Sequence, residues 1–406
     1  MTAIAETTVE RGIDDDLARY NAKVLSVAQA LAGANNTVII ATGSIAGAMF
    51  APDKGLATLP ITLMVLGMWV GTVPTGMLAK AKGRRFALQT GSVFGILSGL
   101  ISCAAVLHSS FVLLLLGAFC GGLYAAAHQS YRFAAADTAS AHVRPKVVSL
   151  VLAGGIFAAI IGPQLVITTK DLWPPYLFAA TYVAQSIAAA LAAIVLAFLR
   201  IPRIASHEAA ESARPLRDVV LTPQFIVAVV CGVVSYSMMN MVMTSAPLAM
   251  VGCGHSVTDA SLGIQWHVLA MYGPSFFTGA LIVRFGVVRI VVVGLALLAI
   301  SAAVGISGLS VAHFWIALVL LGLGWNLSFV GATTMITHCH RPSERNMVQA
   351  FNDFLVFGGM AVASFASGKL LATFGWATIN EVVFPTVFVA GALLLIQSLR
   401  SRPQTV

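Results

Sequence analysis

The sequence predicts an all-α integral membrane protein with twelve transmembrane helices, and three observations support this prediction. The 406 residues are 58% hydrophobic and only 9% charged, whereas a soluble domain carries about 25% charged residues. Twelve mostly apolar stretches are each long enough to supply the roughly 20 residues that a helix needs to cross a bilayer. Lys and Arg gather in alternate connections between these stretches, as they do on the cytoplasmic side of membrane proteins.

The predicted spans fall into two groups of six. The first group covers residues 24–48, 56–79, 86–107, 111–135, 146–168 and 174–199. The second group covers residues 222–249, 260–283, 289–309, 312–337, 347–372 and 379–399. These stretches are about twice as long as a barrel strand and do not alternate in polarity, which favours helices. Outside them we expect a cytoplasmic leader (1–23), a central cytoplasmic linker (200–221) and a cytoplasmic tail (400–406).

The positions of the charged residues orient the chain. With a cytoplasmic N-terminus, all but three of the 23 Lys and Arg residues fall on the cytoplasmic side, the exceptions being Lys54, Lys170 and Lys369. We therefore expect both termini in the cytoplasm and the chain in the inner or plasma membrane. The first twenty residues are polar and acidic, which is not typical of a signal peptide. The net charge of +8 reflects this bias and forms no basic face for nucleic acid.

The two groups of spans echo each other at an offset of about 203 residues, which indicates a duplicated membrane bundle. The segment Gly76-Met77-Leu78 after the second span matches Gly279-Ala280-Leu281 after the eighth span. Gly83 matches Gly286 at the same offset, and Asn36 of the first span corresponds to Asn240 of the seventh. A shared offset and equal span counts together support the repeat more strongly than any single match does.

The connection after the second span carries a recognisable motif, Gly76-Met77-Leu78-Ala79-Lys80-Ala81-Lys82-Gly83-Arg84-Arg85. It resembles the signature loop of the major facilitator superfamily, Gly-x-Leu-x-Asp-Arg-x-Gly-Arg-Arg/Lys, in its glycines, its Leu and its final basic pair. The resemblance covers the whole chain, because that family also has six plus six spans and a central linker. It implies two pseudo-symmetric six-helix bundles, a substrate site between the halves, and transport by alternating access.

The signature loop departs from the family pattern at its acidic position, which is Lys80 here. In the family this loop acts as a cytoplasmic latch, and its acid faces the N-terminus of helix eleven, where a carboxylate is favoured. Lys80 would be repelled there, so we expect Lys80 or Arg84 to pair with Asp137, Glu344 or Asp353. The alternative is that Lys80 has no pairing role and is simply one of the basic residues found on the cytoplasmic side.

Span five carries Ala158-x-x-x-Gly162-Pro163, which resembles the helix-five antiporter motif of the family without its first and trailing glycines. That resemblance favours export. The alternative is structural, because small residues four apart let two helices approach closely and a proline bends its helix.

Polar side chains inside the spans are costly in hydrocarbon and are therefore candidates for substrate binding. The resemblance implies that helices one, four, seven and ten line the site. The candidates are Gln29 and Asn36 in span one, Tyr124 and His128 in span four, Tyr236 and Asn240 in span seven, Tyr272 in span eight, and Trp325 and Asn326 in span ten. For each residue, packing or hydrogen bonding between helices is the alternative. Aromatic rings with a few amides favour a planar or amphipathic organic solute.

Three further residues are candidates for coupling. His128 lies inside a span, where a histidine can take part in proton transfer or bind substrate. Asp353 is the one acid expected within a span, and a proton relay and a latch role are both open for it. Arg132 lies near the cytoplasmic edge, with snorkelling or pairing with Asp137 as the alternative to coupling.

The motifs of other protein classes are not found in the sequence. It contains no HExxH, no known Ser/His/Asp order and no phosphate-binding glycine loop, so we expect neither an enzyme nor an ATP-driven pump. Its five cysteines are scattered without a CxxC pair, and we expect no metal site, no disulfide and no cofactor.

The predicted function is secondary transport of a small organic solute by a monomer in the lipid bilayer. Proton-coupled transport, a facilitated-diffusion uniporter and a drug or metabolite efflux antiporter remain open. A more distant alternative is a transporter-like sensor or scaffold.

Overall fold

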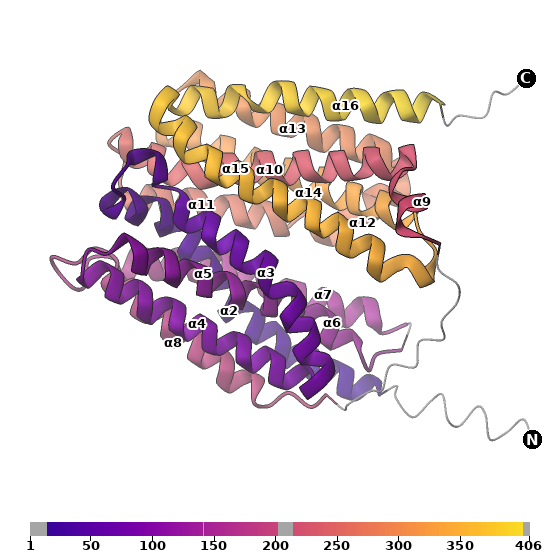
Figure 1. The fold of residues 1–406 in the computed structure, drawn as a ribbon, viewed down its shortest axis with the longest axis horizontal. Helices are drawn as coiled ribbons and strands as arrows, with labels where there is room; N and C mark the ends of the chain where they lie inside the picture. Colours follow the sequence, from indigo (N-terminus) through magenta and orange to yellow (C-terminus); the bar gives the residue numbers. More distant parts are fainter. Residues whose placement is uncertain (1–13, 141, 202–213, 401–406) are drawn as a thin grey trace, which may run out of the picture. The chain divides into compact units, whose positions relative to one another are not determined.

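The computed structural model describes residues 14–140, 142–201 and 214–400, and helices are the regular structure of these residues (Figure 1). In the first half the helices are α2 (Asp15–Phe50), α3 (Leu59–Lys82) after the short η2 (Lys54–Leu56), α4 (Arg84–Leu107), α5 (Phe111–Gln129), α6 (Tyr131–Ala136), α7 (Arg144–Thr169) and α8 (Ala179–Leu196). Residues 1–13 of the expected leader, most of the central linker and the end of the tail lie outside the described residues.

The second half begins with α9 (Leu216–Val220) and continues with α10 (Pro223–Gly252), α11 (Val257–Tyr272), α12 (Ser275–Phe285), α13 (Val287–Ser307), α14 (Val311–Thr337), η3 (Pro342–Glu344), α15 (Arg345–Glu381) and α16 (Val383–Arg400). Helices α11 and α12 are together long and apolar enough to cross a membrane, with a bend of 43° between them. Gly375, with φ of 83°, interrupts α15 and separates the last two spans of the 54-residue apolar stretch Met347–Arg400. With these breaks taken into account, the helices correspond to the expected spans. The all-α membrane fold is confirmed.

Helix α2 begins before the first apolar span. Its first turn holds Asp15 and Asp16, and Asp14 accepts a hydrogen bond from the backbone N–H of Leu17 at 2.9 Å. Carboxylates satisfy the unpaired N–H groups at a helix N-terminus and favour its positive dipole end. The helix therefore starts nine residues before residue 24, the predicted start of the first span.

The described residues form two compact units whose boundaries differ from simple chain order. One unit contains residues up to 39 and 67–208, and the other contains residues 40–66 and those from 209 onward. Within the second unit, Thr58 donates to the backbone oxygen of Ser364 at 3.0 Å, and Thr62 donates to the Ser364 hydroxyl at 3.1 Å. A Cβ at Gly368 would lie 2.3 Å from the Thr58 hydroxyl, so this crossing requires a glycine.

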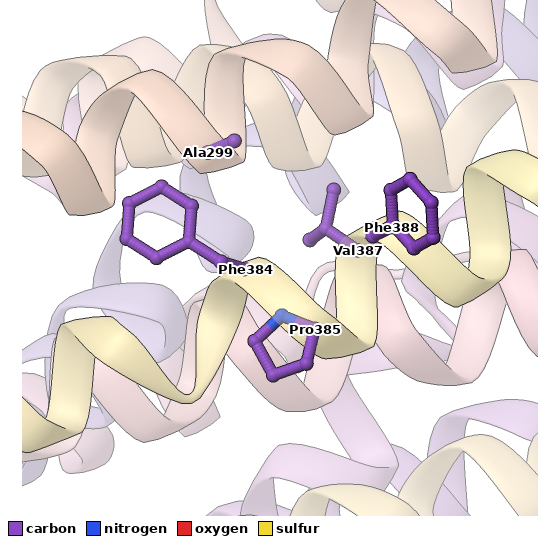
Figure 2. Close-up of a pocket in the computed structure, with 5 residues that line it drawn as sticks. All are labelled: Ala299, Phe384, Pro385, Val387 and Phe388. Carbon is purple, nitrogen blue, oxygen red and sulfur yellow. The ribbon is translucent and has the colours of Figure 1, made fainter.

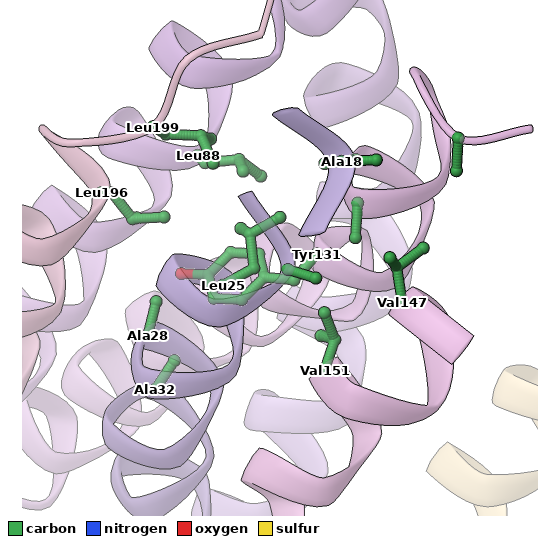
Figure 3. Packing of buried hydrophobic residues seen from close by; sticks show 14 of the residues in the cluster. Ala18, Leu25, Ala28, Ala32, Leu88, Tyr131, Val147, Val151, Leu196 and Leu199 are labelled. Carbon is green, nitrogen blue, oxygen red and sulfur yellow. The ribbon is translucent and has the colours of Figure 1, made fainter. Parts of the chain in front are cut away.

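The first unit packs through small side chains and an apolar core. A Cβ at Gly33 of α2 would lie 2.6 Å from that of Ala158, and one at Gly162 would lie 2.7 Å from Thr37. The small residues of the antiporter-like motif therefore sit at a close α2–α7 crossing. Figure 3 shows the adjoining core, in which Tyr131 lies among apolar side chains of α2 and α7 such as Leu25, Ala28, Val147 and Val151.

Candidate functional site

The second unit holds a group of aromatic rings that we call the aromatic corner, made of Tyr236 (α10), Trp325 and Phe329 (α14), and Phe357 (α15). Trp325 and Phe329 are one helical turn apart and stack at 5.2 Å between ring centroids. The Tyr236 ring lies 4.8 Å from Phe329, 5.2 Å from Trp325 and 6.4 Å from Phe357. Tyr236, Phe329 and Phe357 are only partly buried, so the corner keeps ring surface that a flat ligand can cover.

Two polar side chains, Trp325 of the corner and Asn240 on the helix that carries Tyr236, have unused hydrogen-bonding capacity. Asn240 follows Tyr236 by one turn, and its Nδ2 donates to the backbone oxygen of Met360 on α15 at 3.2 Å. Its Oδ1 and the indole Nε1 of Trp325 are buried and have no hydrogen-bond partner among the described residues. One buried acceptor, on the helix that carries Tyr236, and one buried donor, on Trp325, are therefore left without a partner in the described chain.

Asn326 and Tyr272 lie at the break between α11 and α12. Asn326 donates to the Met271 backbone oxygen and to the Ser275 hydroxyl, both at 2.7 Å. It also accepts from Thr278 at 2.6 Å, so its amide is used to hold the bent span together. Tyr272 is the last residue of α11 and is partly buried.

Two adjacent asparagines of α2 have different surroundings in the first unit. Asn35 donates to the Gly95 backbone oxygen at 3.4 Å and accepts from Gln185 at 3.2 Å, which ties α2 to α4 and α8. The Oδ1 of Asn36 is buried and has no partner among the described residues. Gln29 is partly buried, with its Cβ facing Gly154 of α7. Of the two asparagines, Asn36 is therefore the one whose amide oxygen has capacity left for a ligand.

The α5–α6 candidates form an aromatic group of their own. The His128 ring lies edge-on to Tyr124 and Tyr131, at 6.2 Å between centroids in each case. Both ring nitrogens of His128 are buried and without a hydrogen-bond partner in the described chain. Tyr124 packs against Gly95 of α4, where an added Cβ would meet its ring at 2.4 Å. Arg132 lies over the Phe133 ring at 4.8 Å.

The signature loop has the same backbone form in both copies. Gly83 has φ of 94° and precedes α4, and Gly286 has φ of 85° and precedes α13. A positive φ is accessible to glycine and strained for other residues. This shared conformation explains why both copies of the loop have a glycine here.

The first copy of the loop contains an ion pair. Arg84 Nε lies 2.9 Å from Asp137 Oδ2, and both side chains are partly exposed. Lys80 and Arg85 are exposed. Asp353 is also exposed and accepts from Asn352 at 3.1 Å. Arg84 is therefore in contact with Asp137, one of the three acids considered.

Glu344 has a different partner, which sequence reasoning did not find. Its fully buried carboxylate accepts from Arg214 Nε at 2.7 Å and from Arg214 Nη2 at 2.8 Å. The Arg341 backbone N–H donates to it at 2.9 Å. The Arg214 guanidinium and the Arg341 N–H hold the pKa of Glu344 well below its ordinary value, although burial opposes them. The sequence signal is weak, because 130 residues separate the two partners.

A groove of about 500 Å³ between α13 and α16 has a different character (Figure 2). Its lining is apolar and consists of Ala299, Phe384, Pro385, Val387 and Phe388. The Phe388 side chain is 75% exposed, as suits contact with lipid hydrocarbon. The groove offers no polar group to orient a solute, so we do not assign substrate binding to it.

The long apolar helices, the duplicated signature loop and the polar groups buried within spans define a multi-pass membrane transporter of a small solute. The Major Facilitator Superfamily profile matches residues 25–273 and 228–406, and the chain belongs to this family.

Curated relatives and solved structures agree with this family. The riboflavin transporter RfnT of Brucella anthropi is 46% identical over 394 residues, covering 96% of this chain and 98% of that one. The uncharacterized MFS-type transporter YddS of Bacillus subtilis is 28% identical, covering 88% of this chain and 86% of that one. The nucleoside transporter NupG has a TM-score of 0.72 at 11% identity, with 93% of this chain and 98% of that one covered. A bacterial homolog of the lysosomal transporter Spinster has a TM-score of 0.71 at 16% identity, covering 95% and 98%.

Proposed function

We propose that this chain carries riboflavin, or a flavin closely related to it, across the inner or plasma membrane by alternating access. The observation that supports this proposal most directly is the 46% identity to a riboflavin transporter over almost the full length of both chains. The aromatic corner adds a physical reason, since a flavin has a planar three-ring isoalloxazine. Aromatic contacts are worth about 0.5–1.5 kcal/mol each beyond the area that they bury.

In this proposal the isoalloxazine lies against the partly exposed rings of Tyr236, Phe329 and Phe357. The rings of the corner are already in contact with one another, at 4.8–5.2 Å for the closest pairs. A ligand ring therefore covers their outer surfaces and does not insert between them. In the first unit, Asn36 and His128 have unpaired polar groups that suit a hydroxylated solute.

The mode of transport is a separate part of the proposal. Proton-coupled transport, facilitated diffusion and efflux by antiport are all compatible with the fold. His128 is the stronger candidate for coupling because its ring is buried and unpaired in the described chain, whereas Asp353 is exposed. Replacing His128 with Gln and Asp353 with Asn, one at a time, tests each residue for loss of accumulation against a gradient.

Expression in a riboflavin-auxotrophic host that lacks its own flavin uptake tests the proposed substrate. We expect growth at low riboflavin and time-dependent uptake of radiolabelled riboflavin, competed by unlabelled riboflavin. Phe329→Leu should reduce uptake because it removes a stacking ring. Phe388→Ala, in the lipid-facing groove, is the matched control and should keep it.

A membrane-inserted protein that moves no riboflavin in either direction, in cells or in proteoliposomes, would refute the substrate assignment. Collapse of the proton gradient by an ionophore separates coupled accumulation from facilitated diffusion. Efflux from preloaded vesicles separates export from import.

A further inference from the structure

Two buried polar atoms, one on Trp325 of the aromatic corner and one on Asn240 of α10, make no hydrogen bond within the described residues. Asn240 is 1% exposed and Trp325 is 7% exposed. A polar atom buried without a partner costs free energy, and such atoms in folded proteins usually indicate a ligand, a water or a strained site. Asn240 Oδ1 and Trp325 Nε1 have no such partner among the described residues, which leaves both able to bind a ligand.

The chemical identity of each free group is fixed by its surroundings. The Met360 backbone oxygen can only accept, so the Asn240 amide must turn its Nδ2 toward it. This leaves Oδ1 as an acceptor. The indole nitrogen of Trp325 can only donate. The missing partner must therefore supply one donor and one acceptor.

Both free groups come from the helices that supply the rings. Asn240 lies one turn after Tyr236 on α10, so the two side chains share a helix face. Met360, which holds Asn240, lies three residues after Phe357 on α15, and Phe357 contacts Tyr236. The Trp325 ring lies 5.2 Å from the Tyr236 ring. Both polar groups therefore belong to residues that neighbour Tyr236, Asn240 along α10 and Trp325 through its ring.

We propose that Asn240 and Trp325 recognise the edge of the ligand ring, and that this edge is a cyclic imide in which an N–H lies between two carbonyls. The inference rests on the proposed flavin transport, because the pyrimidinedione edge of isoalloxazine has this pattern. Its N3–H donates to Asn240 Oδ1, and a neighbouring carbonyl accepts from Trp325 Nε1. The rings of the corner supply affinity, and these two groups select among flat ligands.

Ligand analogues test the donor part on the unaltered protein. Binding is measured with purified protein in detergent by quenching of flavin fluorescence, using riboflavin and N3-methylriboflavin, in which a methyl group replaces the N3 proton. We expect riboflavin to bind about tenfold or more tightly, because a site built around a ligand N–H rejects the analogue that lacks it.

Variants assign this preference to its residues. Asn240→Ala should bring the ratio of the two dissociation constants close to one. Phe329→Leu is the matched control, because it should weaken both ligands together and leave the ratio unchanged. The role of Trp325 is tested with 2-thioriboflavin and 4-thioriboflavin, in which sulfur replaces one of the two carbonyl oxygens beside N3. Each analogue competes with riboflavin for binding. We expect the unaltered protein to bind at least one of them several-fold more weakly, and Trp325→Phe to lose that difference.

The outcomes separate the inference from the function on which it rests. Riboflavin binding with equal affinity for N3-methylriboflavin would overturn the imide assignment and leave riboflavin transport standing. The same equality is expected if an ordered water fills the gap. Folded protein that binds no riboflavin would refute the proposed function itself. If Asn240→Ala does not fold, the comparison of riboflavin with N3-methylriboflavin on the unaltered protein still decides the inference.

Discussion

Asn35 and Asn36 show how adjacent residues of one type can have different roles. Asn35 is held by hydrogen bonds to Gly95 and Gln185, whereas Asn36 Oδ1 is without a partner in the described chain. Interhelical hydrogen bonds in membranes contribute about 0.6 kcal/mol each on average. Asn35→Ala should therefore lower the free energy of unfolding by about 1–2 kcal/mol, since buried partners are also left unpaired.

Asn36→Ala is the matched comparison, because it removes the same side-chain type one residue away. We expect little change in its melting temperature but a reduced rate of riboflavin uptake. Melting of the detergent-purified proteins and uptake normalised to membrane-inserted protein give the two readouts. The opposite pattern, with Asn36→Ala unstable and Asn35→Ala stable, would contradict the assignment.

Asn326 is a residue whose hydrogen-bond partners could not be predicted from the sequence. A polar residue in the middle of the tenth predicted span is a candidate for substrate binding. Its hydrogen bonds to Met271, Ser275 and Thr278 lie at the break of a neighbouring span. A sequence does not show that α11 and α12 need a side chain from α14 at their bend.

At the scale of elements, the Arg84–Asp137 ion pair links the start of α4 to the end of α6. Both side chains are about one-third exposed or less, and such pairs contribute roughly 0.2–1 kcal/mol. Arg84→Ala and Asp137→Ala should each slow transport if the pair acts as a latch. The double variant should lose less uptake and less unfolding free energy than the two single variants lose in sum.

A charge reversal supplies the stricter form of this test. Arg84→Asp combined with Asp137→Arg should recover part of the activity that either single reversal loses. Lys80→Ala is the control on the same loop, since Lys80 is exposed. Strictly additive losses in the double variants would show that the two residues act independently.

The loop between α14 and α15 is anchored in a way that resembles the corresponding loop of the first half. Asp15 accepts from the backbone N–H and the hydroxyl of Ser140, at 2.8 and 2.9 Å. In the second half, the backbone N–H and guanidinium of Arg214 bind Glu344. In each case, a residue that precedes the first predicted span of a half is tied to the loop after its fourth span. In the first half the acid is Asp15, which precedes the first predicted span. In the second half the acid is Glu344, which lies in the loop after the fourth span.

The Glu344 carboxylate predicts a dependence of stability on pH. Its folded-state pKa is lowered by Arg214 and by the Arg341 N–H, so on acidification the unfolded chain binds the proton first. Its contribution to stability is therefore complete above the ordinary Glu pKa, about 4.3, and is lost as the pH falls toward the folded-state value. Melting temperature should hold from pH 7 down to about pH 4.3 and decline below it, in measurements carried to about pH 3.

Glu344→Gln should melt at a lower temperature at pH 7 and should show a smaller decline on acidification. Glu381→Gln is the matched control, because Glu381 is exposed at the end of α15. If the melting temperature of Glu344→Gln falls on acidification as much as that of the unaltered protein, the decline comes from other carboxylates.

At the scale of the whole molecule, hydrophobic length and basic connections predicted the membrane fold and its spans. The signature loop predicted the family, which the profile and the relatives confirm. These signals are local in the sequence, since a span needs only about 20 apolar residues in a row. A motif such as Gly76–Arg85 is likewise contained in ten residues.

The remaining features depend on contacts between distant residues. Thr58 meets Ser364 across 306 positions, and Arg214 meets Glu344 across 130. No local pattern in either segment names its partner. Tyr236, Trp325 and Asn240 were all candidates from the sequence, but Phe357 joins them only because α15 packs against α10.

The expected orientation of the chain gives the last prediction, and two positions on different connections test it. With a cytoplasmic N-terminus, the exposed Cys253 between α10 and α11 faces the outside, and the exposed Ser343 between α14 and α15 faces the cytoplasm. In a chain whose other cysteines are replaced by Ala, Cys253 should react with a membrane-impermeant maleimide in intact cells. Ser343→Cys, with Cys253 also replaced, should react only after lysis. The reverse pattern would invert the topology, and labelling of both positions in intact cells would contradict the intervening spans.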